Sequence, residues 1–213
     1  MDLRLDHVFL FVELAEARPG GAVHDRLAAA GLVPSYERRH HGQGTANVCW
    51  CFDDAYLELL FVVDPDEIAA PATARSRLAE RARWRTTGAS PVGIGLRGGA
   101  LPLPTWEYRF EGLPPGLSIP VAAASDDVRR PFVFVSPGTR PPVEWTDGHA
   151  GVRQVAAGWT GFAVEIDTGA APAGDLEALV SAVPGVTLAR RPAAPLNLVL
   201  TGPGGRRRRI ELP

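Results

Sequence analysis

The sequence predicts an α+β protein, because strand-like and helix-like segments alternate along the chain and the same order of segments occurs near both ends. Residues 1–63 read as a strand, a helix and three strands, which is a βαβββ unit. From residue 152 a strand, a helix, a polar strand and a hairpin follow in the same order. Few letters are shared between the two units, so the repeat is one of pattern, and we expect a pair of βαβββ modules.

The first unit begins with residues 5–12, LDHVFLFV, an apolar run of strand length. A Pro-Gly-Gly break follows, and VHDRLAAAGL then predicts a short helix that ends at Gly31. The polar stretch 36–41 leads to NVCWCF and AYLELLFV, which read as a hairpin that turns at Asp53 and Asp54. The unit therefore supplies four strands and one helix.

The rest of the chain divides by composition. Residues 65–89 are rich in Arg and Ala and predict a helical connector, whereas 90–148 alternate short strand-like runs with Pro/Gly loops. Residues 149–213 contain the second unit, with GWTGFAVEI as a strand, DLEALVSAVPG as a helix and NLVLTGPGGRRRRIEL as a final hairpin. We therefore expect four segments, 1–64, 65–89, 90–148 and 149–213.

Composition and charge are those of an ordinary globular protein, with 46% hydrophobic and 22% charged residues. A net charge of −2 provides no broad positive field, so we expect neither nucleic acid nor a membrane as partner. In a strand the RRRR run at 206–209 alternates between two faces, which favours a solvated strand. The first residues lack a basic segment and a cleavage site, so we expect no signal peptide and no transmembrane helix. The two cysteines imply no disulfide framework, so we expect a cytoplasmic location.

Two residue types narrow the chemistry further. The chain has no lysine, which excludes lysine Schiff-base chemistry and the lysine of a phosphate-binding P-loop. Cys49 and Cys51 lie two apart in a predicted strand, so both side chains lie on one face in a poor geometry for a disulfide. We expect both to be small buried residues in a reducing compartment.

Glu58 is the unusual residue of the first unit, because it lies in the middle of the apolar run YLELL. Strand alternation places His7 on one face with Phe9 and Phe11, and Glu58 on one face with Tyr56. If both faces line the same space, an imidazole and a carboxylate meet there, and these are N/O ligands for a divalent metal. The alternative is structural: Glu58 pairs with an arginine of a neighbouring strand and His7 caps a backbone group.

Three motifs carry a family resemblance: LDHVFLFV (5–12), HHGQGTAN (40–47) and YLELL (56–60), supported by PFVFV (131–135) and the histidine of DGHAG (147–151). With them the chain resembles the glyoxalase-like branch of the vicinal oxygen chelate superfamily, which includes glyoxalases, bleomycin-resistance proteins and extradiol dioxygenases. The resemblance implies paired βαβββ modules whose curved mixed sheets surround a central cleft.

The resemblance also implies a metal site in that cleft. A divalent cation (Zn, Ni, Mn or Fe) would support lyase, isomerase or dioxygenase chemistry, with Glu58 as metal ligand or catalytic base. In the second unit Glu211 matches Glu58, whereas Gly161 stands where His7 falls in the first. The expected ligands are therefore His7, Glu58, His149 and Glu211.

Other positions are expected to contact a small-molecule ligand. The glycine turn before residue 45 lets backbone amides approach a ligand, and a guanidinium between glycines suits an anion. These considerations select His41, Thr45, Asn47 and Arg97. Two alternatives stay open, a metal-free protein that binds or sequesters a small molecule in the same cleft, and a structural domain with a filled cleft. The resemblance further implies that two copies can pair as a homodimer.

Overall fold

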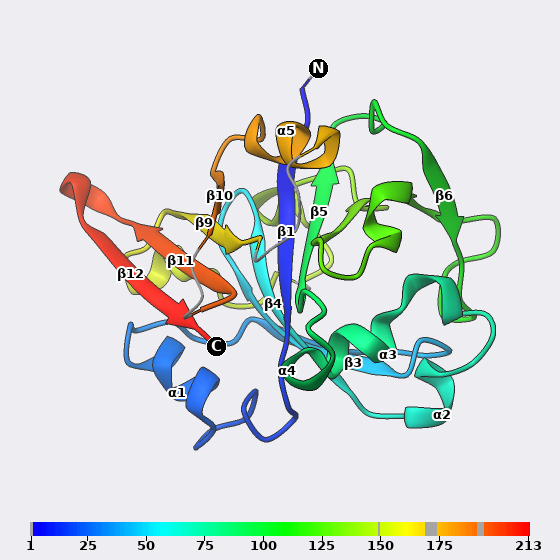
Figure 1. The fold of residues 1–213 in the computed structure, drawn as a ribbon. Helices are drawn as coiled ribbons and strands as arrows, with labels where there is room; N and C mark the ends of the chain where they lie inside the picture. The colour runs from blue at the N-terminus through cyan, green and yellow to red at the C-terminus, as the bar shows by residue number, and fades with distance from the viewer. Residues whose placement is uncertain (1, 149, 169–173, 191–193) are drawn as a thin grey trace.

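The computed structural model describes residues 2–148, 150–168, 174–190 and 194–213 of the chain (Figure 1). Within these residues, 12 strands form two mixed sheets, one of eight strands and one of four, with helices between them. The predicted α+β class, with curved mixed sheets around a cleft, is confirmed.

The large sheet contains β1 (Arg4–Phe11), β2 (Tyr36–His40), β3 (Thr45–Cys51), β4 (Tyr56–Val62), β5 (Val92–Arg97), β6 (Thr105–Tyr108), β7 (Ile119–Ala122) and β8 (Phe132–Val135). Its order is β2-β3-β4-β1-β5-β8-β7-β6. Strands β5–β8 therefore repeat the order of β1–β4, and the two halves meet where β1 pairs antiparallel with β5. In Figure 1 these two strands lie side by side at the centre of the molecule.

The small sheet contains β9 (Gly161–Asp167), β10 (Val186–Ala189), β11 (Leu196–Thr201) and β12 (Arg207–Leu212), in the order β10-β9-β11-β12. This segment keeps the expected sequence of elements but not the strand order of β1–β4. The strands that repeat that order come from the middle region of the chain. Strand order depends on long-range pairing, which a local pattern of apolar residues does not encode. The predicted boundaries of the four segments stay a prediction.

The α-helices of the described residues are short: α1 (Ala22–Ala28), α2 (Pro65–Ile68), α3 (Leu78–Ala82), α4 (Trp84–Thr87) and α5 (Asp175–Ser181). The described residues also form five short 3-10 helices: η1 (Ala74–Ser76), η2 (Ala123–Asp126), η3 (Pro142–Glu144), η4 (Gln154–Ala157) and η5 (Pro203–Gly205). The predicted helical connector is thus broken into short pieces, one break being the left-handed conformation of Arg77 (φ 53°). None of the described helices has the length and apolar character that a membrane crossing requires.

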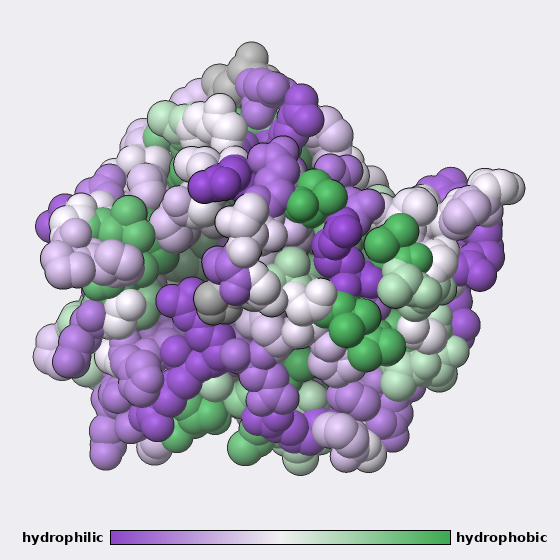
Figure 2. All heavy atoms as spheres, turned by 180° about the vertical axis from the view of Figure 1, so that it is seen from behind, coloured by the Kyte–Doolittle hydropathy of each residue, from purple (hydrophilic) through white to green (hydrophobic). Residues whose placement is uncertain are grey.

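The two faces of β1 face two different hydrophobic clusters. Val8 and Leu10 join a cluster that includes α1 and the small sheet, whereas Phe9 and Phe11 join a second cluster with β6–β8. The small sheet therefore covers one face of the first half, and the other face is left to line a cleft. On the surface, Figure 2 shows small hydrophobic groups separated by hydrophilic residues across the face opposite to that of Figure 1.

A buried arginine joins the connector to the second half of the large sheet. Arg81 in α3 is fully buried, and its guanidinium donates to four backbone carbonyls, those of Ser90, Ser125, Val128 and Arg130, at 2.7–3.2 Å. Burial lowers the pKa of Arg81 to about 10, so it remains charged at neutral pH. This interaction fixes α3 against the loops that precede β5 and β8.

Candidate functional site

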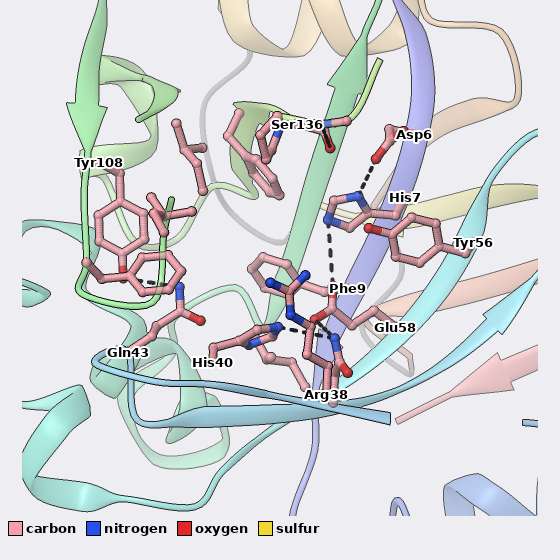
Figure 3. Close-up of a pocket in the computed structure, with 18 of the residues that line it drawn as sticks. Asp6, His7, Phe9, Arg38, His40, Gln43, Tyr56, Glu58, Tyr108 and Ser136 are labelled. Carbon is pink, nitrogen blue, oxygen red and sulfur yellow. Dashed lines mark hydrogen bonds and ion pairs between the residues drawn. The ribbon is translucent and has the colours of Figure 1, made fainter. Parts of the chain in front are cut away.

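A cavity of about 690 Å³ opens between the two halves of the large sheet. Its polar wall comes mainly from the first half: Asp6, His7, Arg38, His40, Gln43, Asn47 and Glu58 (Figure 3). Its apolar wall is largely aromatic and includes Phe9, Tyr56, Tyr108, Phe110, Phe132, Phe134 and Trp145. A volume of this order and an apolar lining with a few polar groups are typical of small-molecule sites.

His7 is held by rings on one side and by a glycine on the other. Its ring stacks on Tyr56 at 4.5 Å between centroids and meets the edge of Phe134 at 5.3 Å. In β5 its cross-strand neighbour is Gly95, where an added Cβ would lie 2.5 Å from His7 Cε1. Gly95 therefore leaves the space that the imidazole occupies, a role that its sequence motif did not predict.

Asp6 orients His7. The pairing of β1 with β5 shifts register between Leu5 and His7, and such an irregularity lets neighbouring side chains leave strict alternation. Asp6 Oδ2 lies 2.8 Å from His7 Nδ1, and Asp6 Oδ1 lies 3.7 Å from the guanidinium of Arg97. The carboxylate accepts the Nδ1 proton, so His7 presents Nε2 toward Glu58.

The charge state of His7 follows from its neighbours. Burial by itself lowers the pKa of His7, but the hydrogen bond to Asp6 and the negative charges of Asp6 and Glu58 outweigh burial. The pKa of His7 is therefore raised above its ordinary value. The residue is thus a candidate proton donor inside the cavity.

Glu58 lies in β4 next to His7 and is nearly fully buried. Its Oε1 accepts a hydrogen bond of 2.7 Å from Asn47 Nδ2, and its Oε2 lies 3.6 Å from His7 Nε2. The Glu58 carboxylate, although it lies in an apolar strand, thus has an amide donor and an imidazole as partners. Oε2, which accepts no hydrogen bond from Asn47, is the oxygen on the His7 side.

A chain of hydrogen bonds extends the polar wall beyond Asn47. His40 Nδ1 lies 2.9 Å from Thr45 Oγ1, and Thr45 donates to Gln43, whose amide donates to Tyr108. Because the Thr45 hydroxyl already donates to Gln43, it accepts from His40, which places the proton of neutral His40 on Nδ1. Burial lowers the pKa of His40, and the charge of Arg38 lowers it further, against an opposing effect of Glu58.

The second half has no comparable polar set at the matching rows of the sheet. The row that contains Tyr56 and His7 continues with Gly95 in β5 and Phe134 in β8. The next row contains Glu58 and Phe9 and continues with Gly93 and Phe132. Glycine and phenylalanine occupy both rows in the second half. Among the described residues, the titratable side chains of these two rows therefore come from the first half alone.

The structure brings together only some of the residues selected from the sequence. His7, Glu58 and Asn47 line the cavity, and Thr45 is linked to Asn47 through His40. Arg97 lies behind Asp6 and also donates to the Leu5 carbonyl at 2.6 Å.

Two other selected residues lie elsewhere, and a third is not described. His41 is exposed and does not line the cavity, whereas its neighbour His40 does. Glu211 is exposed on β12 in the small sheet, away from the cavity lining. His149 lies outside the described residues.

The polar wall offers His7 and Glu58 as possible ligands of a divalent cation. The 3.6 Å between His7 Nε2 and Glu58 Oε2 is close to the separation of about 3.4 Å expected for two ligands of one tetrahedral ion. A catalytic zinc site commonly uses three protein ligands, and no group of three His, Cys, Asp or Glu residues in the described part of the chain could hold a metal. These residues alone therefore do not fit a resident catalytic metal.

The first half of the large sheet and β5 carry the family signal. Residues 5–98 match the family model described as a glyoxalase-like domain, which confirms the resemblance read from the motifs. Residues 5–98 form a glyoxalase-like domain. This segment contains His7 and Glu58 together with their hydrogen-bond partners, Asp6 and Asn47.

The chain is similar in structure to several solved proteins, all at low sequence identity. Methylmalonyl-CoA epimerase in complex with methylmalonyl-CoA is 15% identical, over 67% of this chain and 100% of that chain, with a TM-score of 0.43. A hypothetical protein from Staphylococcus aureus is 12% identical, over 99% and 86%, with a TM-score of 0.45. Streptomyces coelicolor methylmalonyl-CoA epimerase is 15% identical, over 63% and 98%, with a TM-score of 0.41. No curated protein matches the sequence significantly.

Proposed function

We propose that this glyoxalase-like protein binds a small molecule with a flat apolar body in the cavity, and that Glu58 and His7 move a proton at the polar end of that molecule. The observation that supports the proposal is the buried pair itself, with Nε2 and Oε2 3.6 Å apart beside an aromatic cavity. Oriented titratable groups in a cleft are typical of catalytic sites.

The chemistry follows from the partners of each group. Asn47 holds one oxygen of Glu58, and the other oxygen is available to take a proton from a carbon next to a carbonyl group. His7, held by Asp6 and protonated over a wider pH range than an ordinary histidine, donates a proton to the carbonyl oxygen. The product is an enol, and return of the two protons in a different arrangement gives an isomer, with no other reactant consumed.

A panel of aryl-substituted carbonyl compounds, with phenylacetone and phenylpyruvate among them, tests this proposal. Binding is measured as a shift of the melting temperature, and proton transfer as deuterium uptake from D₂O next to the carbonyl, followed by NMR. We expect binding together with exchange that Glu58→Gln abolishes. Binding without any exchange above the protein-free rate would remove the catalytic part, and no binding at all would remove the proposal.

A second candidate is binding without chemistry, as in a sequestering protein. It is favoured by the second half of the sheet, where glycine and phenylalanine stand at both rows that face His7 and Glu58. The deuterium experiment separates the two, because a sequestering protein raises its melting temperature with the probe and leaves the exchange rate unchanged.

A metal-assisted version of the same function would use His7 and Glu58 as two ligands of a divalent cation, with a third supplied from elsewhere. Its test is the melting temperature of metal-free protein with Zn, Ni, Mn or Fe(II) added one at a time. A rise that is lost in Glu58→Ala would favour this version, and the absence of any rise would favour proton transfer by the side chains alone.

A further inference from the structure

Arg38 is a cation of the cavity wall that the proposed proton transfer does not use. It lies in β2 and pairs across the strands with Asn47, so both side chains lie on the cavity face of the sheet. It lines the cavity, and Figure 3 shows its side chain extending from the strand into the region of His40 and Glu58. The side chain is exposed, so a ligand that enters the cavity can reach it.

Nearby arginines are paired, whereas Arg38 has no partner in the part of the chain that the structure describes. Arg39, the next residue of the same strand, pairs with Asp64 and Glu67 on the opposite face. Arg97 pairs with Asp6. Among the described residues, no hydrogen-bond acceptor or carboxylate partners the guanidinium of Arg38.

Three carboxylates that line the cavity have partners other than Arg38. Asp6 lies between His7 and Arg97, and Glu58 accepts from Asn47 beside His7. Glu37, at the cavity edge, accepts from Arg18. The neighbouring His40 has a lowered pKa and is neutral, so it neither competes for an anion nor adds positive charge.

A free guanidinium beside an apolar cavity selects for a particular ligand. Its planar fork binds a carboxylate through two parallel hydrogen bonds, which a neutral amide cannot reproduce. The aromatic wall accepts the apolar body of the same molecule. We infer that the natural ligand is a carboxylic acid with an aromatic or similarly flat apolar body, and that Arg38 binds its carboxylate; this inference rests on the proposed function of the cavity.

The test compares matched probes that differ only in charge. 2-Naphthoate, phenylacetate and phenylpyruvate are titrated beside their neutral amides, with 2-naphthyl phosphate as a second anion. Affinity is measured by calorimetry and by melting temperature. We expect the carboxylates to bind about tenfold or more tightly than the amides, because hydrogen bonds to charged groups contribute more than neutral ones.

Variants of two adjacent arginines assign the effect to its source. Arg38→Gln is expected to lower carboxylate affinity about tenfold to a hundredfold and leave amide affinity unchanged, with Arg38→Lys between it and the wild type. Arg39→Gln, on the other face of the same strand, is the matched control and is expected to keep the preference for carboxylates. Because Arg38 has no partner among the described residues and the ion pairs of Arg39 are solvent-exposed, we expect the variants at both positions to fold, which circular dichroism checks.

The outcomes separate the inference from the proposed function. Equal affinity for acids and amides, an unchanged preference in Arg38→Gln, or an equal loss in Arg39→Gln overturns the role of Arg38 and leaves the cavity as a binding site. Tighter binding of the phosphate than of the carboxylates overturns the choice of carboxylate. If no probe of any series binds, the inference and the proposed function fall together.

Discussion

Strands β1–β4 and β5–β8 follow one another with the same order in the large sheet, yet their cavity-facing side chains differ in kind. The first half places His7 and Glu58 where the second half has glycine and phenylalanine. The glycines of β5 leave room for the rings of β1, and the phenylalanines of β8 form the wall opposite. The comparison teaches that the repeat is architectural: one half places titratable side chains on the cavity, and the other supplies space and apolar contact.

The largest expected effect is that of Glu58→Gln in the first half. We expect the deuterium-exchange rate to fall at least about a hundredfold, because the general base is lost while the side chain keeps nearly the same volume. The measurement is exchange into whichever carbonyl probe binds most tightly. Glu37→Gln, an edge residue paired with Arg18, is the control and should leave the rate unchanged. An equal loss in both variants would contradict the assignment of Glu58 as the base.

Gly95→Ala tests whether the second half supplies space. The added methyl would lie 2.5 Å from Cε1 and 2.7 Å from Nδ1 of His7, so the imidazole or the strand must move. We expect a loss of about 1–3 kcal/mol in the free energy of unfolding, measured with urea. Gly99→Ala is the matched control, because nothing lies within 4 Å of a Cβ there. If Gly95→Ala were as stable as that control, the space argument would be wrong.

Asp6→Asn tests whether the Asp6 carboxylate is what raises the pKa of His7. The pKa of His7 is raised in the folded protein, so its contribution to stability is full below the unfolded pKa of about 6.5 and is lost as pH rises through the folded pKa. Without the Asp6 carboxylate, burial dominates, and the pKa of His7 falls. We therefore expect the stability difference between wild type and variant to shrink as pH rises above about 6.5.

Two measurements check this prediction, urea unfolding across pH 6–9 and NMR titration of the His7 ring. His40 contributes with the opposite sign, since its lowered pKa makes it lose stability as pH falls, but it is common to both proteins. Asp25→Asn removes a carboxylate beside His24, a partly buried histidine that does not line the cavity, and is the control. A His7 titration curve that does not move in Asp6→Asn would exclude Asp6 as the source of the shift.

Phe134→Leu is expected to have the smallest effect. The change removes an edge contact with His7 and some apolar wall, so we expect a loss of about 1 kcal/mol in stability and a few-fold weaker binding. The exchange rate at saturating probe should stay within about twofold of wild type, because no proton donor or acceptor is lost. A fall in that rate like that of Glu58→Gln would break the division between the two halves.

The sequence was sufficient for the parts of the site that follow from strand alternation. His7 and Glu58 face one space because β1 alternates regularly from His7 onward and β4 alternates around Glu58, and the fold class follows from the order of segments. Asp6 could not be predicted, since alternation places it opposite His7 and a register shift in β1 brings the two together. Glu211 was selected because its strand resembles that of Glu58, but strand order, which depends on long-range pairing, places it in the other sheet.

Arg38 shows the same limit for long-range information. In the sequence it is one of many arginines, and its neighbours Arg39 and His41 have equal claims. Only the pairing of β2 with β3 shows which side chains face the cavity and which partners Arg39 has already taken. The local pattern was therefore sufficient to identify His7 in β1 and Glu58 in β4. Arg38 at the edge of the cavity could be identified only from the pairing of strands in the sheet.

The four carbonyl acceptors of Arg81 have a consequence for how this protein tolerates change. Every residue type carries a backbone carbonyl, so positions 90, 125, 128 and 130 can vary in sequence without losing their bond to the guanidinium. These hydrogen bonds therefore depend on the residue type at position 81 alone, since a lysine cannot present a planar fork of donors to the same acceptors. A substitution at any of those four positions therefore leaves the carbonyl acceptor in place, whereas a substitution of Arg81 removes all four hydrogen bonds from the helix that also carries Leu78 of the cavity wall.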